Sequence, residues 1–202
     1  MLASAKGYRL LLSVALHTGL RQAEILGLWW SNIDFSNKAI HVTGQLDRGR
    51  KEEGVWIRPD RVEYAKSEAG CRKVELIPSD LFKALREHKL ASGHSQDEDF
   101  VFVTLAGTPI DHKDASTRGL GKAKQRAKLD VAWKPNLRFH DLRHTYVSAN
   151  IAAGVDVVYL SKQLGHTDPC VTLDIYADLF EGRQKAEASR ELLEASGYGG
   201  LV

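Results

Sequence analysis

The hydrophobic positions of this chain recur mainly at helical spacing, and alternating stretches interrupt them only in its first half. From Ala5 to Thr18, one apolar stripe predicts an amphipathic helix, and Gly19 is typical of the turn that ends such a helix. A second helix is predicted from Arg21 to Leu28, followed by a turn from Trp30 to Asn37. The chain is therefore expected to open with two successive helices.

Three later stretches alternate between apolar and polar residues, as β-strands do. They run from Lys38 to Gly44, from Gly54 to Tyr64 and from Cys71 to Ile77, with a turn at Lys66–Gly70. We expect them to pair as one small antiparallel sheet of three strands. The charged stretch from Leu46 to Arg61 is longer than a minimal hairpin needs, and we expect an extended loop there.

The second half of the chain predicts a series of helices. Ser79 can cap a helix that runs from Asp80 to Ala91, and a basic helix is expected from Ala115 to Leu129. Glycine, proline and aspartate mark the ends of the remaining helices, which are expected at His140–Ala153, at Asp156–Leu164, from Pro169 through Tyr176, and at Arg183–Ala195. The predicted fold class is α+β, mainly α-helical, with a small three-stranded antiparallel sheet.

The composition fits a globular protein and argues against several other classes. Of the 202 residues, 43% are hydrophobic and 27% are charged. No apolar run approaches the ~20 residues that span a bilayer, so no membrane association is expected. The two cysteines, Cys71 and Cys170, lie far apart, which argues against a disulfide scaffold or a zinc site and is compatible with a reducing cytoplasm.

The net charge of +2 is only mildly basic, so binding to nucleic acid would have to depend on local clusters of cations. Taken alone, each cluster is at least as typical of a solvated surface as of a DNA contact. The candidates for DNA contact are Arg48, Arg50, Lys51, Lys122, Lys124 and Arg126.

The residues that could carry chemistry are cations, imidazoles and a phenol, without paired acids. His140 and Arg143 are three apart on one predicted helix and therefore share a face, while Glu24 stands one turn after Arg21 and can orient its guanidinium. Taken singly, each of these residues is more typical of a helix cap, a surface ion pair or core packing than of a catalytic site. Together with Tyr176, they suit phosphoryl transfer without a metal, because fixed cations can meet the charge that develops when a phenol attacks.

Four blocks of the sequence carry a family likeness. HTGLRQAEILGLWWSNID, AKSEAGCRKVELIP, FHDLRHTYVSANIAAGVDVVYLSKQLGH and TLDIY resemble the motif blocks of the tyrosine recombinase, or phage integrase, family. The resemblance covers Ala5 to Leu179, which corresponds to that family's catalytic domain. It implies a site-specific DNA recombinase that cuts and rejoins DNA through a 3′-phosphotyrosyl intermediate, without metal, ATP or another cofactor.

The resemblance implies a role for each residue that matches the family pattern. Arg21 and Arg143 would clamp the scissile phosphate, Tyr176 would attack it, and Glu24 would orient Arg21. The implied catalytic set is Arg21, Lys66, His140, Arg143, His166 and Tyr176.

Three members of that set would handle protons. Lys66, on the hairpin between two strands, would protonate the leaving 5′ oxygen. His140 would assist proton transfer around the nucleophile, and His166 would donate to a non-bridging phosphate oxygen.

The resemblance also predicts domains and partners. Residues 1–180 would form the catalytic domain and 181–202 a C-terminal helix and tail, with the family's N-terminal core-binding domain absent from this chain. Double-stranded DNA at a crossover site would be the partner, with self-association to a tetramer on DNA and DNA-bending accessory proteins. The expected location is the cytoplasm of a bacterium, for a protein of bacterial or phage origin.

Two other functions fit the same residues. A type IB topoisomerase uses similar chemistry, although the HDLRHT and Gly165-His166 motifs resemble recombinases more closely. A non-catalytic DNA-binding module of the same fold is the alternative from a different class, and the complete catalytic set argues against it.

Overall fold

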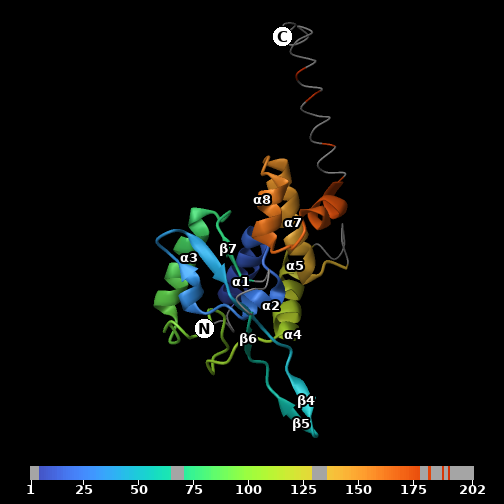
Figure 1. Cartoon of the computed structure of the whole chain (residues 1–202). Coiled ribbons are helices and arrows are strands. Elements are labelled where there is room, and N and C mark those ends of the chain that lie inside the picture. Colours follow the sequence, from blue (N-terminus) through green and yellow to red (C-terminus); the bar gives the residue numbers. More distant parts are fainter. Residues whose placement is uncertain are drawn as a thin grey trace.

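The computed structural model describes residues 5–64, 71–128 and 136–177, together with Gly182, Ala188 and Glu191. It has the predicted mainly helical α+β fold (Figure 1). Lys66 and the end of the basic helix at Leu129 fall outside the described residues. Of the expected helix from Arg183 to Ala195, only Ala188 and Glu191 are described, and both are helical. No helix in the described ranges is long and apolar enough to cross a membrane.

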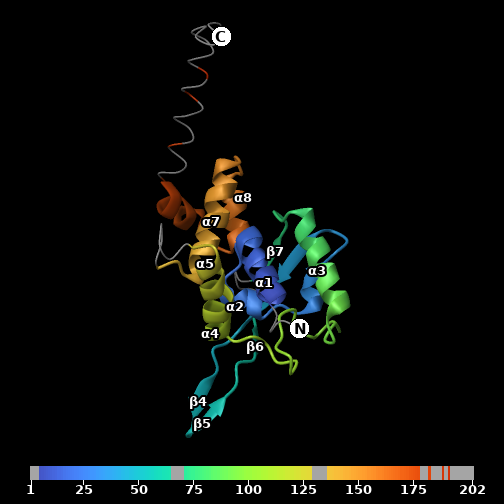
Figure 2. The same ribbon diagram turned by 180° about the vertical axis from the view of Figure 1, so that it is seen from behind.

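Helix α1 (Ala5–Thr18) lies at the centre of the molecule (Figures 1 and 2). Its predicted apolar stripe buries Leu11, Val14 and Ala15 completely or nearly so. The helix contacts α3 (Ser79–Ala91), the helical segment η2 (Ala115–Gly121) and α7 (Phe139–Ala152). One core cluster thus joins the sheet side of the molecule to its C-terminal helices.

The predicted three-stranded sheet is present, but one of its strands differs from the expectation. Its order is β1 (Ile33–Asp34), β2 (Ala39–Val42) and β7 (Arg72–Val74), all antiparallel. The short strand β1 lies within the stretch expected to be a turn. It pairs antiparallel with β2 and takes the third place in the sheet. The stretch 54–64, which was expected there, lies outside this sheet.

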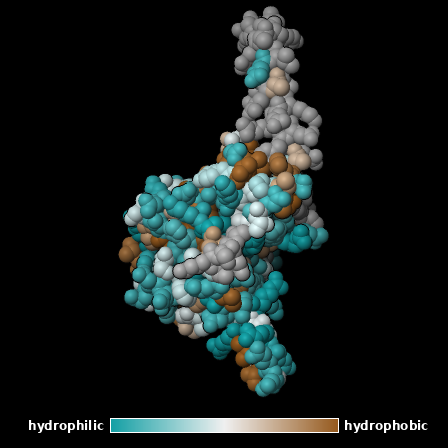
Figure 3. All heavy atoms as spheres, viewed as in Figure 1, coloured by the Kyte–Doolittle hydropathy of each residue, from teal (hydrophilic) through white to brown (hydrophobic). Residues whose placement is uncertain are grey.

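That stretch is divided between two hairpins. Strand β6 (Arg61–Glu63) pairs with β3 (Gly44–Leu46), and β5 (Val55–Ile57) pairs with β4 (Arg50–Glu52). The expected extended loop is therefore an ordered hairpin that projects away from the body of the domain (Figure 1). Every residue of both strands is exposed, and the surface of the hairpin carries hydrophobic residues (Figure 3).

The neck of this hairpin is held by the aspartate at its start. Asp47 Oδ1 accepts hydrogen bonds from the backbone nitrogens of Gly49 and Asp60, both at 2.9 Å, and Asp47 N donates to Asp60 O. The ring of His112 lies 3.1–3.2 Å from the carbonyl oxygens of Leu46 and Asp47. The base of the hairpin is therefore fixed to the domain.

The helices of the second half occur close to their predicted positions. Helices α4 (His112–Asp114) and α5 (Lys122–Arg126) flank η2, which is π-helical, so the predicted basic helix starts earlier. Helix α3 begins at Ser79 with Pro78 as its N-cap, so the prediction that Ser79 caps this helix is wrong. The Ser79 hydroxyl instead accepts a hydrogen bond from Lys38 Nζ.

The last described helices form a second core cluster. Helix α8 (Val157–Leu164) is capped by Asp156, and a further helix covers residues 169–177, as predicted. Tyr146, Val147, Leu160 and Tyr176 are all buried in this cluster. The C-terminal half of α7 thus shares its core with the helix that carries Tyr176.

Candidate active site

The first part of the site is the turn between α1 and α2 (Gln22–Leu26). Arg21 is the N-cap of α2, and its backbone nitrogen donates to Glu24 Oε2 at 2.7 Å. Its side-chain Nη1 donates to Glu24 Oε1 at 2.9 Å, so the contact predicted from the three-residue spacing is present. The Glu24 side chain is fully buried, whereas the Arg21 side chain is 40% exposed. Arg21 therefore presents an oriented cation to the solvent.

A second arginine, Arg72 of β7, holds Glu24 from the opposite side. Its Nη1 and Nη2 each donate to a carboxylate oxygen at 2.9 Å, and its Nε donates to Gln163 O at 2.8 Å. Burial raises the pKa of the Glu24 carboxyl, but the hydrogen bonds and charges of Arg72 and Arg21 outweigh burial and hold it below its ordinary value. Glu24 is therefore an anion shared between two guanidinium groups.

Arg72 is not among the functional residues expected from the sequence. A usable signal was nevertheless present, because alternation in a strand places Arg72 on the same face as Val74, which is buried. A buried acid within an apolar helix also requires a partner, since an unpaired charge is costly to bury. These two requirements together point to an inward-facing arginine opposite Glu24.

Arg143 is the third arginine of the site, and it is 5% exposed. From α7 its Nη1 donates to Gly19 O at 2.6 Å and its Nη2 donates to Leu164 O at 2.8 Å. Burial and the charge of Arg21 lower the pKa of the Arg143 guanidinium to about 10, which leaves it a cation at neutral pH. Arg143 therefore joins the ends of α1 and α8 through their free carbonyl groups.

His166 follows the left-handed Gly165 that ends α8, as predicted. Its Nε2 lies 3.0 Å from Nη2 of Arg143, and its Nδ1 lies 2.8 Å from Oγ1 of Thr172. Because a guanidinium can only donate, Nε2 accepts and Nδ1 carries the hydrogen. Burial and the charge of Arg143 lower the pKa of His166 to about 4, so the ring is neutral at physiological pH.

Tyr176 lies one turn beyond Thr172 and is 7% exposed. Its hydroxyl oxygen is 2.5 Å from Nδ1 of His144, whose ring packs edge-on against that of His140 with centroids 4.9 Å apart. Burial raises the pKa of the Tyr176 phenol, and the charge of Arg143 opposes that rise. Sequence reasoning missed His144, although its spacing of four from His140 on α7 places both histidines on one face.

Arg21 and His140 line the same hollow, which has a volume of about 520 Å³. Arg48 and His112 line it as well, so the neck of the projecting hairpin forms part of its wall. The hollow is bordered by two arginines, two histidines and one acid, Asp47, whose Oδ1 is hydrogen-bonded to backbone nitrogens of the hairpin. The two guanidinium groups suit an anionic group such as a phosphate. The structure thus brings together Arg21 and His140 from distant parts of the sequence.

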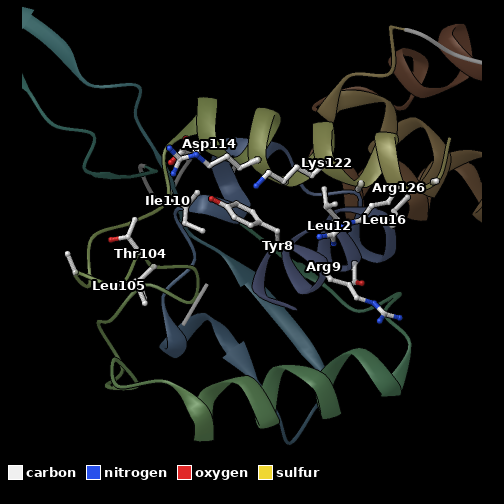
Figure 4. Close-up of a pocket in the computed structure, with 17 residues that line it drawn as sticks. Tyr8, Arg9, Leu12, Leu16, Thr104, Leu105, Ile110, Asp114, Lys122 and Arg126 are labelled. Atoms are coloured by element: carbon white, nitrogen blue, oxygen red, sulfur yellow. Dashed lines mark ion pairs between the residues drawn. The ribbon is translucent and has the colours of Figure 1, made fainter. Parts of the chain in front are cut away.

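A larger hollow of about 1140 Å³ lies on another part of the surface, between α1 and the segment η2–α5 (Figure 4). It is lined by Tyr8, Leu12 and Leu16 on one side and by Lys122 and Arg126 on the other. Two candidates for DNA contact, Lys122 and Arg126, therefore line a different hollow from Arg21. Lys124 belongs to the same helix, and Arg50 and Lys51 lie on the projecting hairpin.

Lys66 belongs to the stretch 65–70, which is outside the described residues. The residues that flank this stretch lie close to Glu24. Burial and, as the second cause, the charge of Glu24 raise the pKa of Tyr64 to about 12. Arg72 is hydrogen-bonded to the same carboxylate. The chain therefore enters and leaves this stretch beside the buried acid.

Comparison with known proteins gives consistent matches. The profile described as the phage integrase family matches residues 3–183. A tyrosine recombinase XerC-like protein of Caldanaerobacter subterraneus subsp. tengcongensis is 33% identical, over 93% of this chain and 50% of that protein. The transposase from transposon Tn916 of Enterococcus faecalis is 27% identical, over 88% of this chain and 44% of that protein. The chain thus spans about half the length of these relatives.

Solved structures have a similar fold. The Tn1549 transposon integrase in complex with transposon right end DNA superposes with a TM-score of 0.69 at 25% identity, covering 89% of this chain and 57% of that one. The XerA recombinase superposes with a TM-score of 0.59 at 18% identity, covering 85% of this chain and 62% of that one. The second likeness concerns the fold alone.

Proposed function

The chain belongs to the phage integrase family, and on that premise we propose that it is the catalytic domain of a site-specific DNA recombinase. It would cut and rejoin DNA through a 3′-phosphotyrosyl bond at Tyr176. The observation that carries the proposal is the network from Arg21 through Glu24 and Arg72 to the end of α8, where Arg143 contacts His166. These groups come from four separate parts of the chain and form one cationic site beside the Tyr176 helix.

Arg21 is the first contact for the scissile phosphate in this proposal. It is partly exposed, it lines the hollow with His140, and Glu24 fixes its guanidinium. A bidentate contact would place one guanidinium on two phosphate oxygens and balance the single negative charge that they share. Arg143 is 5% exposed and donates to two backbone carbonyls, so its guanidinium must become more exposed before it can reach the same phosphate.

The reaction conserves the energy of the phosphodiester. The Tyr176 oxygen forms a bond to phosphorus, the bond from phosphorus to the 5′ oxygen breaks, and Lys66 supplies the proton that the leaving oxygen takes up. His140 would assist proton transfer from the hollow. His166 would donate to a non-bridging oxygen once Arg143 has turned to the phosphate and the ring hydrogen of His166 has moved from Nδ1 to Nε2. Religation reverses the step, so the proposal requires no metal, ATP or other cofactor.

Double-stranded DNA is the proposed partner, held mainly through its phosphates. Arg48 is the candidate best placed for this contact, because it lines the same hollow as Arg21. Binding through phosphates weakens steeply with salt, since each contact releases condensed counterions. Assembly into a tetramer on DNA, with accessory DNA-bending proteins, belongs to the same proposal.

A nicked suicide duplex tests the proposed function. The nick lies just 3′ of the cleaved phosphate, so the short leaving fragment diffuses away and the covalent adduct accumulates. We expect the wild type and Tyr159→Phe, a matched exposed tyrosine, to form a labelled adduct that survives denaturing electrophoresis, and Tyr176→Phe to form none.

Two outcomes would favour the other functions. DNA binding without an adduct would favour a non-catalytic module. Relaxation of supercoiled plasmids of any sequence would favour a topoisomerase.

A further inference from the structure

His144 stands between the proposed nucleophile and the hollow. Its Nδ1 is 2.5 Å from the Tyr176 hydroxyl oxygen, and the two rings have centroids 5.7 Å apart. On its other side, the ring of His140 packs edge-on at 4.9 Å. His140 is exposed and lines the hollow, whereas His144 is only partly exposed.

A phenol must lose its proton to become an effective nucleophile. The ordinary pKa of tyrosine is about 10, and burial raises that of Tyr176 further. A general base must therefore lie within hydrogen-bonding distance of the phenol oxygen. Within the described part of the chain, His144 is the basic side chain that forms this hydrogen bond.

We propose that His144 is the general base that accepts the proton of the Tyr176 hydroxyl during DNA cleavage. The inference rests on the proposed function and gives a role to a residue outside the catalytic set that the resemblance implies. The proton leaves the phenol oxygen and forms a covalent bond to Nδ1 of His144. The phenol oxygen then forms its bond to phosphorus. The proton returns to the phenol when religation releases Tyr176.

The two histidines of α7 then have different tasks. His144 contacts the nucleophile, whereas His140 faces the space in which the phosphate would sit. Burial and the nearby charges of His144 and Arg143 lower the pKa of His140. A neutral His140 does not oppose the positive charge that His144 gains. Within the described ranges, the titratable side chains in hydrogen-bond or ring contact with His144 are His140 and Tyr176, and Arg143 is its neighbour in the sequence.

The test uses the whole chain and a pool of nicked duplexes that carry a randomised stretch beside the nick. The cleaved strand is labelled at its 5′ end, and the rate of adduct formation is measured for wild type, His144→Gln and His17→Gln. Glutamine can still bond to the phenol but cannot take its proton. We expect His144→Gln to slow adduct formation about 100- to 10,000-fold at neutral pH, and the exposed control His17→Gln to leave the rate unchanged.

A more acidic nucleophile separates proton transfer from packing. Incorporation of 3,5-difluorotyrosine at position 176 reduces the need for a base, so the defect of His144→Gln should shrink at least tenfold. His144→Phe preserves the ring packing and should give the same pattern if glutamine loosens the fold. The rate of His144→Gln should also rise with pH over a range in which the wild-type rate is constant.

The outcomes distinguish this proposal from the proposed function. Equal losses with tyrosine and difluorotyrosine would overturn the role of His144 as a base while leaving the recombinase function intact. An unchanged rate in His144→Gln would do the same. Failure of the wild type to form an adduct with any member of the pool would overturn both proposals, because His144 would have no reaction to serve.

Discussion

Arg72 forms a bidentate ion pair with Glu24, in which Nη1 and Nη2 each lie 2.9 Å from a different carboxylate oxygen. Neither side chain is more than 7% exposed. The same carboxylate also accepts hydrogen bonds from the backbone nitrogen and from Nη1 of Arg21. The position of the exposed arginine is therefore set from inside the protein, by a buried ion pair that does not itself reach the hollow.

The first prediction concerns this ion pair. Arg72→Met leaves Glu24 with a single partner, and breaking a buried pair in this way should reduce the free energy of unfolding by about 3–5 kcal/mol. Urea denaturation measures this change in the free energy of unfolding. The adjacent control Lys73→Met breaks an exposed pair with Glu75 and should leave the free energy of unfolding nearly unchanged, because solvent screens this pair. The double variant Glu24→Leu with Arg72→Met should recover most of the loss. Comparable effects of Arg72→Met and Lys73→Met would contradict the prediction.

Gly165 provides the second prediction. Its φ is +70°, and a Cβ atom there would lie 2.9 Å from Nη1 of Arg72. Gly165→Ala should cost about 1–2 kcal/mol from its left-handed backbone alone, and more because Arg72 must move. Adduct formation should fall as well, since Glu24 loses its fixed position. Gly93→Ala is the control, because a Cβ there meets nothing within 4 Å. If both variants melt at the same temperature, the close approach to Arg72 has no energetic consequence.

The third prediction is that lysine cannot replace Arg143. One ammonium group cannot reproduce the fork that donates to both Gly19 O and Leu164 O. Arg143→Lys should therefore lose about 1–3 kcal/mol, the cost of an unsatisfied buried carbonyl, and adduct formation should become undetectable. Arg86→Lys, at an exposed arginine of α3, should be neutral in both assays. A wild-type rate in Arg143→Lys would remove this residue from the proposed phosphate clamp.

The fourth prediction addresses Lys66 through the leaving group. Lys66→Ala should slow cleavage strongly when the leaving group is a 5′-hydroxyl, because the departing oxygen needs a proton. With a 5′-thiol leaving group, which departs as the anion, the same variant should be close to wild type. Single-turnover rates on matched oxygen and sulfur substrates measure the difference. Equal losses on both substrates would exclude Lys66 as the general acid.

The fifth prediction is a pH dependence of stability. The pKa of His166 is about 4 in the folded protein and about 6.5 in an unfolded chain. Between these values the unfolded state binds more protons, so His166 contributes its full stabilisation above pH 6.5 and loses it as the pH falls towards 4. Allowing for the partial exposure of the ring, we expect a contribution of about 1–2 kcal/mol.

Urea denaturation at pH 7 and pH 4.5 measures this contribution. His166→Gln removes the titrating group and should flatten the pH dependence relative to wild type. The comparison with wild type is needed because burial also lowers the pKa of His88, which acts in the same direction. Identical slopes for the two proteins would show that His166 does not titrate abnormally.

The sequence by itself determined most of the local structure. Helical periodicity, together with the stop signals Gly19 and Gly165 and the start signal Pro169, located α1, α8 and the helix of Tyr176, because these signals act within one or two turns. The contact between Arg21 and Glu24 could be predicted for the same reason. The motif blocks also predicted the family to which the chain belongs.

The tertiary structure alone decided which distant groups meet. The alternating pattern indicated that the stretch 54–64 is extended, but it did not indicate that this stretch divides into β5 and β6. Strand pairing depends on the register between two strands in space. The contacts of Arg72 with Glu24 and of His144 with Tyr176 join residues from separate elements. A buried charge or hydroxyl takes the partner that the folded core brings within about 3 Å, and local sequence does not encode that distance.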